Sequence, residues 1–456
     1  MRRFTPFAIL AAVGLALAGC GTSNEPSDDT STGAENTPEE TTAAATDEAE
    51  TPDDSTEAGG SDVSGDVEVF TWWTAGSEAL GLEALQGVLA AKYPDVNFIN
   101  GGVTGGGGSA KELLQTRLQA NQPPDSFQVH AGKEAQDYID AGQVTDVSAL
   151  YEEFGLTDVF PQDLLDMLTQ DGKIYTIPSN VHRANVLWAS VPALEQAGID
   201  PQATTYASVD DFIADLQKIQ DSTDLIPLSI GGTWTQVHLL ECVLIAELGP
   251  EAYLGLFDGT TDWAGSEVGG ALEKFGTLIG FTNDDRDQYD WEPASQMVVD
   301  GTAVFNVMGD WVPALLDSTG LVDGTDYVWA PAPGTDGVYD FLADSFSLAQ
   351  GAPHPDGAKA WLDVISSADG QEAFNKVKGS IPARTDLDLA ALGFSDYQQQ
   401  AAQSFATDAI VGSIQHGAAA TIQQGNATND AVSKFTTSGS TDLETFQSEL
   451  AAAYAG

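Results

Sequence analysis

The sequence predicts an α/β fold arranged in two lobes, and three observations carry this prediction. Strand-like and helix-like segments alternate from Val67 onward, a rhythm typical of a parallel sheet flanked by helices. About 390 residues remain after a low-complexity N-terminal stretch, which is enough chain for two domains. Two extended segments, 173–178 and 185–188, are expected to cross between the lobes.

The first half of the folded region gives a clear order of elements. A strand at 67–70 runs into Trp72 and Trp73, and a helix with leucines on one side covers 78–93 until Pro94 stops it. A strand at 96–99, a helix from about Ala110 and a strand at 126–129 follow. Ligands of such sheets bind beyond the carboxyl ends of the strands, so we expect a crevice there.

The second half repeats the pattern without any internal sequence repeat. The periodicity predicts a helix at 209–219, a strand at 225–230 and a helix at 234–248. Strands are expected at 303–307, 327–331 and 345–348, and the chain closes with helices.

The N-terminus has the features of an export signal. Two arginines precede an apolar run from Phe7 to Ala18, which is too short to span a bilayer. The run closes on Leu17-Ala18-Gly19-Cys20, which resembles the lipobox of bacterial lipoproteins, so residues 1–19 are expected to be a signal peptide and Cys20 a lipidated first residue. An ordinary signal peptide that contains a cysteine is the alternative. Residues 20–65 are acidic and small and predict a disordered tether.

The charge balance excludes several classes of partner. The chain carries 69 acidic and 16 basic residues, and such a polyanion repels nucleic acid and anionic lipid. Adaptation to high salt and simple acidity of a secreted protein both account for it. Cys242 has no disulfide partner once Cys20 is lipidated, and is expected to be buried in a helix.

The known cofactor motifs are not satisfied. The glycine run 105–108 lies between a strand and a helix, but Ala110 precedes Lys111 where a Walker loop needs glycine, and no acid ends the next strand to support a dinucleotide site. The five histidines show no HExxH or close ligand pair, and no G-x-S-x-G elbow appears. We therefore expect no cofactor, no metal and no serine hydrolase of that type.

The predicted strand ends carry an unusual variety of side chains, which suit a sugar. A pyranose has apolar C–H faces and a rim of hydroxyls, so it needs flat aromatic surfaces with fixed donors and acceptors. Core packing of a tryptophan and surface exposure of an acid are the alternatives at each position. Because neighbouring side chains on a strand face opposite ways, at least one of Trp72 and Trp73 is expected to face the crevice. The candidates are Trp72, Trp73, Glu78, Gln128, His130, Trp234, Asn306 and Asp310.

Several segments also resemble the extracellular solute-binding proteins of ABC importers, in particular the glucose/mannose-binding subgroup. They span the folded part and include Phe70-Thr71-Trp72-Trp73, Pro123 to Gly132 with Gln128-Val129-His130, Trp234-Thr235-Gln236, Phe305 to Trp311, Asp344-Ser345-Phe346, Lys378 to Ile381 and Gly412 to Gly417. The resemblance implies a two-lobe periplasmic-binding-protein fold with a hinge and discontinuous lobes, formed by 66–181 with 303–345 and by 182–302 with 346–456. It adds Lys378 and His416 to the candidate ligand-binding residues.

The same resemblance implies the function and its partners. The chain would be a non-enzymatic, monomeric receptor on the outer face of the cytoplasmic membrane, held there only by its lipid anchor. It would bind a small neutral sugar such as glucose or mannose and deliver it to ABC permease subunits. Two departures from the family pattern are one extra residue between Trp73 and Glu78, and Tyr253 and Phe257 where tryptophans are usual.

Two other functions stay open at this point. A receptor of the same kind could take a disaccharide or another solute. A lipid-anchored glycosidase could use Glu78 and Asp310 as acid and base, provided that the two carboxylates flank one glycosidic bond.

Overall fold

The computed structural model describes residues 63–104, 106–438 and 442–455, all within the unit Gly59–Gly456. Cys20, the signal peptide and nearly all of the tether lie outside the described residues, so the lipid anchor stays a prediction. Cys242 is buried with a free thiol in helix α8 (Thr233–Asp258), as the sequence predicts. Among the described residues, every helix is too short or too polar to cross a membrane.

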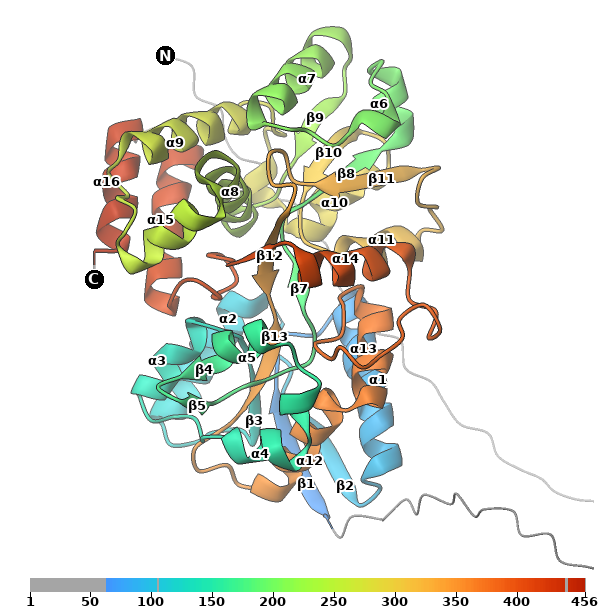
Figure 1. Cartoon of the computed structure of the whole chain (residues 1–456), viewed down its shortest axis with the longest axis vertical. Coiled ribbons are helices and arrows are strands. Elements are labelled where there is room, and N and C mark those ends of the chain that lie inside the picture. The colour runs from blue at the N-terminus through green and yellow to red at the C-terminus, as the bar shows by residue number, and fades with distance from the viewer. Residues whose placement is uncertain (1–62, 105, 439–441, 456) are drawn as a thin grey trace, which may run out of the picture. The chain divides into compact units, whose positions relative to one another are not determined.

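The first sheet has five strands and gathers segments from three parts of the chain (Figure 1). Its order is β2 (Val96–Asn100), β1 (Gly65–Phe70), β3 (Ser126–His130), β13 (Asp344–Leu348) and β6 (Ile177–Pro178). β1 lies parallel to β2 and β3, whereas β13 lies antiparallel to β3 with Asp344 opposite His130. The helices of this part are α1 (Gly76–Lys92), α2 (Gly106–Gln119), α3 (Glu134–Asp140), α4 (Ser148–Glu153), α5 (Gln162–Leu168), α12 (Pro355–Ser366) and α13 (Ala368–Lys378), with a small hairpin of β4 (Thr169–Gln170) and β5 (Lys173–Ile174).

Burial on β1 and α1 follows the spacing of their apolar side chains. Val67 and Val69 are fully buried on β1, and Leu82, Leu85 and Leu89 form the buried face of α1. Helices α12 and α13 pack on α1 from the other end of the sequence. This packing fixes the β1–α1 turn, which carries two of the candidate ligand-binding residues.

The second sheet has four strands and its own core of buried apolar side chains. Its order is β11 (Tyr327–Pro331), β8 (Val186–Ser190), β10 (Ala303–Val307) and β9 (Ile226–Ser229). Helix α8 begins at the end of the β9 segment and kinks at Gly249, where φ is +74° ahead of Pro250. The other helices here are α6 (Val191–Gln196), α7 (Val209–Ser222), α9 (Ser266–Ile279), α10 (Trp291–Val299), α11 (Val312–Ser318), α15 (Ile422–Ser438) and α16 (Leu443–Ala453).

A small third sheet connects the two larger ones. It consists of β14 (Ala409–Gly412), β12 (Val338–Leu342) and β7 (His182–Arg183), with α14 (Asp396–Thr407) beside it in the sequence. β7 lies between β6 of the first sheet and β8 of the second along the chain, and β12 runs into β13 (Figure 1). The crossing that the segments 173–178 and 185–188 predict is therefore present.

The α/β prediction is confirmed, but pairing and packing assign three parts of the chain differently from the predicted lobe boundaries. β10 and β11, which were expected with the first lobe, pair with strands of the second sheet. The helix pair α12 and α13, expected with the second lobe, packs on the first. A residue pattern identifies a strand but not the strand that it pairs with, because pairing depends on contacts far apart in the sequence.

Candidate functional site

A pocket of about 570 Å³ is lined on one side by residues around the first sheet and on the other by residues around the second sheet. Trp72 enters it from the β1–α1 turn, Glu78 from the first turn of α1, and His130 from the end of β3. Trp234 enters from the start of α8, and His416 from the loop after β14. The ends of strands and the starts of helices therefore converge on one pocket, as expected for an α/β fold.

The structure divides the ten candidate residues into two groups. Six line the pocket, namely Trp72, Glu78, His130, Trp234, Lys378 and His416. Four are buried outside its lining, namely Trp73, Gln128, Asn306 and Asp310.

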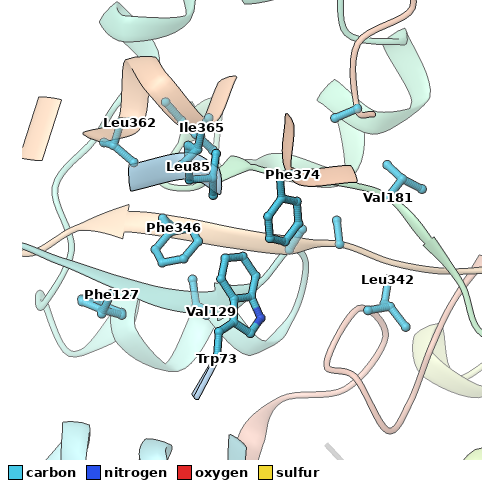
Figure 2. Close-up of a cluster of buried hydrophobic side chains, with 14 of the residues drawn as sticks. Trp73, Leu85, Phe127, Val129, Val181, Leu342, Phe346, Leu362, Ile365 and Phe374 are labelled. Atoms are coloured by element: carbon cyan, nitrogen blue, oxygen red, sulfur yellow. The ribbon is translucent and has the colours of Figure 1, made fainter. Parts of the chain in front are cut away.

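The two adjacent tryptophans face opposite ways. Trp72 lines the pocket, with its ring centroid 5.2 Å from that of His130. Trp73 is 1% exposed and stacks on Phe374 at 4.6 Å, with Phe346 at its edge (Figure 2). The extra residue before Glu78 does not remove Glu78 from the pocket.

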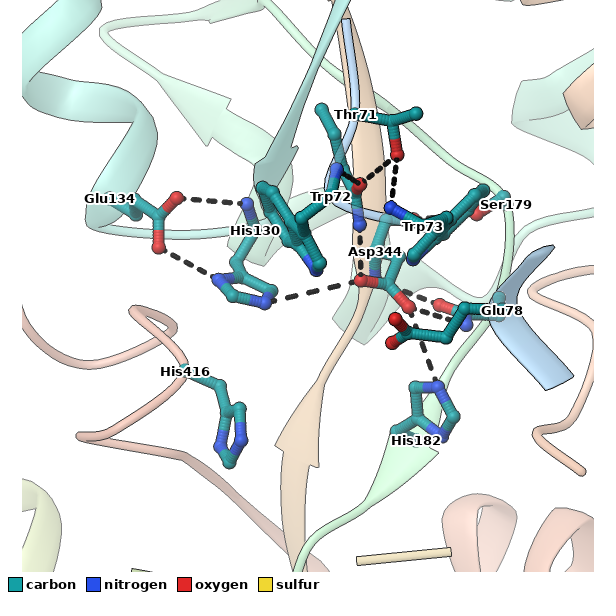
Figure 3. A network of polar contacts seen from close by, with 12 residues as sticks. Thr71, Trp72, Trp73, Glu78, His130, Glu134, Ser179, His182, Asp344 and His416 are labelled. Carbon is teal, nitrogen blue, oxygen red and sulfur yellow. Dashed lines mark hydrogen bonds and ion pairs between the residues drawn. The ribbon is translucent and has the colours of Figure 1, made fainter. Parts of the chain in front are cut away.

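Gln128 acts as a connector behind the pocket wall. Its amide oxygen accepts from the Thr71 hydroxyl and, at 3.3 Å, from the Trp72 backbone N–H. Its Nε2 donates to Asp344 Oδ1 at 2.9 Å (Figure 3). Gln128 thus ties the turn that presents Trp72 to a carboxylate of the pocket wall.

Asp344 and His182 line the pocket and were not among the candidates. His182 Nδ1 bonds to Asp310. Its Nε2 lies 3.4 Å from Asp344 Oδ2 (Figure 3). Burial alone lowers the pKa of His182, but the Asp310 and Asp344 carboxylates outweigh it and raise the pKa above its usual value. His182 is therefore a buried imidazole whose protonated form the two carboxylates favour.

The carboxylates of Asp310 and Asp344 differ in their access to a ligand in the pocket. Asp310 is fully buried and also accepts from the Arg183 backbone N–H at 3.0 Å. Asp344 accepts from Asn180 Nδ2 at 2.9 Å but still lines the pocket. Burial alone raises the pKa of Asp344, yet His182 and Lys378 hold it well below its usual range, so this carboxylate stays ionised.

The two ammonium groups of the pocket wall each lie beside a carboxylate. Lys111 Nζ lies 2.7 Å from Glu134 Oε2. The same oxygen accepts from His130 Nδ1 at 2.8 Å (Figure 3). Burial works to raise the pKa of Glu134, but Lys111 and His130 lower it to about 2. Lys378 Nζ lies 3.1 Å from Glu78. Both ammonium groups of the pocket wall therefore have a carboxylate partner.

Aromatic rings form the wall on the side of the second sheet. Trp234 and Trp291 each lie 6.4 Å from Trp311, centroid to centroid, and all three line the pocket. Trp234 Nε1 donates to Asp290 at 2.8 Å, which fixes the ring. Asn306 is buried behind this wall, where it bonds to Ser295 and to the Ser229 carbonyl.

Tyr253 and Phe257, which replace the expected tryptophans, lie outside the pocket lining. Tyr253 is buried and donates to the Gly412 carbonyl at 2.9 Å, and Phe257 packs against it. Trp291 and Trp311 supply the additional aromatic surface instead, and the residue pattern alone did not single them out.

One group of side chains in the described residues has the composition of a metal site. His238, Glu241 and His416 place possible ligand atoms within 4.8 Å of one another. Both oxygens of Glu241, however, already accept hydrogen bonds from the loop that carries His416. These hydrogen bonds account for the buried Glu241 carboxylate without a metal ion, so we assign none to this group.

Comparison with solved structures defines the class of fold. A chitin oligosaccharide binding protein superposes with a TM-score of 0.75 at 19% identity, covering 86% of this chain and 100% of that chain. Maltose-bound MalE3 of T. maritima superposes with a TM-score of 0.71 at 17% identity, covering 85% and 98%. The fold is thus the two-lobe α/β fold of periplasmic binding proteins.

Sequence comparison then identifies the family. The model described as bacterial extracellular solute-binding protein matches residues 75–372. An uncharacterized ABC transporter extracellular-binding protein of Pyrococcus horikoshii is 32% identical over 82% of this chain and 84% of the relative. A probable sugar-binding periplasmic protein of Mesorhizobium japonicum is 31% identical over 81% and 88%. The chain belongs to the extracellular solute-binding protein family.

Two more distant relatives carry specific sugars in their names. A xylose/arabinose-binding protein of Haloferax volcanii is 29% identical over 78% of this chain and 77% of the relative. A glucose-binding protein of Saccharolobus solfataricus is 26% identical over 73% and 64%.

Proposed function

We propose that this protein is the sugar-binding component of an ABC importer, which captures a small neutral sugar such as glucose or mannose and delivers it to a permease. The observation that carries the proposal is the make-up of the pocket. Trp72 faces it from one side and Trp234 and Trp311 from the other, while each ammonium group is paired. Such a wall suits an uncharged ligand with apolar faces and many hydroxyls.

The candidate residues take distinct roles in this proposal. Trp72, Trp234 and Trp311 offer flat surfaces to the ring, and Asp344 and Glu78 accept from hydroxyls. Lys378, His130 and His416 complete the polar contacts. Trp73, Gln128, Asn306 and Asp310 act from behind by holding these groups in place.

Capture would proceed by closure of the two lobes about the segments that cross between them. A ligand that touches both sides of the pocket stabilises the closed form by its differential affinity for it. The acylated Cys20 and the acidic tether would keep the receptor at the membrane. The glycosidase alternative loses support because Asp310 is fully buried, with its oxygens engaged by His182 and Arg183.

The nature of the sugar is the part that needs measurement, because relatives named for glucose and for pentoses are similarly distant. We propose calorimetric titration of the soluble protein lacking the signal and tether with glucose, mannose, galactose, xylose, arabinose and maltose, and with glucuronate as the charged control. Saturable binding of one neutral sugar with a stoichiometry of one is expected. Binding of glucuronate in preference to all neutral sugars, or hydrolysis of an aryl glycoside, would overturn the proposal.

A further inference from the structure

The loop that carries His416 is anchored on a carboxylate that does not line the pocket. Glu241, on α8, is fully buried. Its Oε2 accepts from the backbone N–H groups of Ile414 and Gln415 at 2.7 and 3.0 Å. Its Oε1 lies 2.9 Å from the Ser413 hydroxyl. Helix α8 therefore fixes the conformation of residues 413–416.

The Ser413 hydroxyl connects Glu241 to the ring of His416. Ser413 Oγ lies 2.9 Å from His416 Nδ1 and accepts from the His416 backbone N–H at 3.1 Å. Because this engages Nδ1, Nε2 is the ring nitrogen left for the pocket. Burial, together with nearby His238, lowers the pKa of His416 well below its usual value, so the ring is neutral and carries one proton.

Because Ser413 has a single hydroxyl proton, the protonation of Glu241 and the tautomer of His416 depend on each other. An ionised Glu241 can only accept, so Ser413 must donate to it and His416 must donate from Nδ1 to Ser413. His416 Nε2 then presents a lone pair to the pocket. With Glu241 protonated on Oε1, the order reverses, because Glu241 donates to Ser413, Ser413 donates to Nδ1, and Nε2 carries the proton.

From this geometry we infer that Glu241 is a positioning residue that sets, through Ser413, whether His416 offers the ligand a hydrogen-bond acceptor or a donor. The change from the ionised to the protonated state takes up one proton in total. One proton enters at Nε2, the Nδ1 proton passes to Ser413, and the Ser413 proton passes to Glu241. The consequence for ligand affinity rests on the proposed function, whereas the consequence for the ring itself does not.

The groups around Glu241 favour a change of state near neutral pH. Burial raises the pKa of Glu241 to about 7. Burial and the neighbouring Glu241 also raise the pKa of Asp340, on β12, so Asp340 is the member of the pair that keeps its proton. Burial also raises the pKa of Tyr339, beside Asp340. Five further titratable or charged groups lie near this pair, namely Arg183, His238, Cys242, Tyr253 and Tyr454.

Of these five groups, only Arg183 is charged. Burial raises the pKa of Cys242 and of both tyrosines and lowers that of His238 to about 4. Glu241 is thus the group in this neighbourhood that changes charge between pH 6 and 8, the interval that brackets its pKa.

The variant Glu241→Gln tests the inference because it imitates the protonated state. Its amide oxygen can accept from Ile414 and Gln415 while its NH₂ group donates to Ser413, so the loop keeps its anchors. Nitrogen-15 spectra of the ligand-free protein, with His416 assigned among five histidines by its loss in His416→Gln, report the tautomer directly. We expect the natural protein to change from Nε2–H to Nδ1–H as the pH rises through about 7. Glu241→Gln should remain Nε2–H at pH 8.

The affinity of the natural sugar provides a second readout. At pH 8 we expect Glu241→Gln to bind about tenfold more weakly than the natural protein, since a ligand hydroxyl loses its acceptor. At pH 6 the dissociation constants of the two proteins should agree within about twofold. Glu247→Gln is the matched control, because this carboxylate of the same helix pairs with Lys274 at 2.8 Å and makes no contact with the loop.

Ser413→Ala distinguishes an effect through the Glu241–Ser413–His416 hydrogen bonds from a general effect on the loop. In that background the tautomer should no longer follow pH, and Glu241→Gln should cause no further loss of affinity. An Nε2–H ring at pH 8 in the natural protein, or an equal loss of affinity with and without Ser413, would overturn the inference. A tautomer change without binding of any sugar would instead refute the proposed function and leave the inference standing.

Discussion

Trp72 and Trp73 are adjacent in the sequence, yet truncating them should damage different properties of the protein. Trp73 is 1% exposed and stacked on Phe374, so Trp73→Ala leaves a cavity in the core of the first lobe. Removal of a buried aromatic side chain lowers the free energy of unfolding by about 3 to 5 kcal/mol. Trp72→Ala removes a pocket wall instead, which at a well-packed binding contact costs about 2 kcal/mol, or roughly thirtyfold in Kd.

Two measurements on the same pair of variants distinguish these effects. Urea unfolding followed by circular dichroism gives the stability, and calorimetry with the sugar identified above gives the affinity. We expect Trp72→Ala to lose less than half as much stability as Trp73→Ala. A folded Trp73→Ala protein that loses more affinity than Trp72→Ala would refute the assignment of the two faces of this turn.

Two further predictions concern Trp311 and His182 in the pocket wall. In Gly309→Ala the new Cβ would lie 2.2 Å from the Trp311 ring, so the ring must move and the affinity for the sugar should fall about tenfold by calorimetry. The control Gly270→Ala has open space around its new Cβ and should bind the sugar like the natural protein. The raised pKa of His182 means that its ion pairs contribute fully below its unfolded value, about 6.5, and are lost as pH rises through the folded value. The stability difference between the natural protein and His182→Gln should therefore be constant below pH 6.5 and shrink above it, and a difference that grows with pH would contradict the pairing.

The local elements were predictable from the sequence because their periodicity is local. The strand at 67–70 and the leucines of the following helix appear where the pattern places them. The membership of β10 in the second sheet was not predictable, because its alternation of residues is compatible with either sheet. Which of Trp72 and Trp73 faces the pocket was also left open, since it depends on the position of Phe374, some 300 residues later in the chain.

The candidate site shows the same limit at the level of single side chains. His130 and Trp234 follow predicted strands and line the pocket, as convergence at strand ends implies. His182 and Asp344 were missed because they lie within segments that cross between the lobes, not after a strand of a parallel pair. Their role depends on a three-residue chain from Asp310 to Asp344 that only the tertiary structure assembles.

The pairing of charges gives the pocket a selectivity that its aromatic walls alone would not provide. The chain has few cations relative to its acids, and two of them, Lys111 and Lys378, line the pocket. If they were unpaired, they would attract acidic solutes into a cavity otherwise surrounded by negative charge. Glu134 and Glu78 neutralise them at 2.7 and 3.1 Å, and Asp344 is held ionised beside them. An acidic sugar would meet Asp344 and Glu78, and each ammonium group among the described lining residues is already paired. A neutral sugar can instead donate its hydroxyls to the same carboxylates.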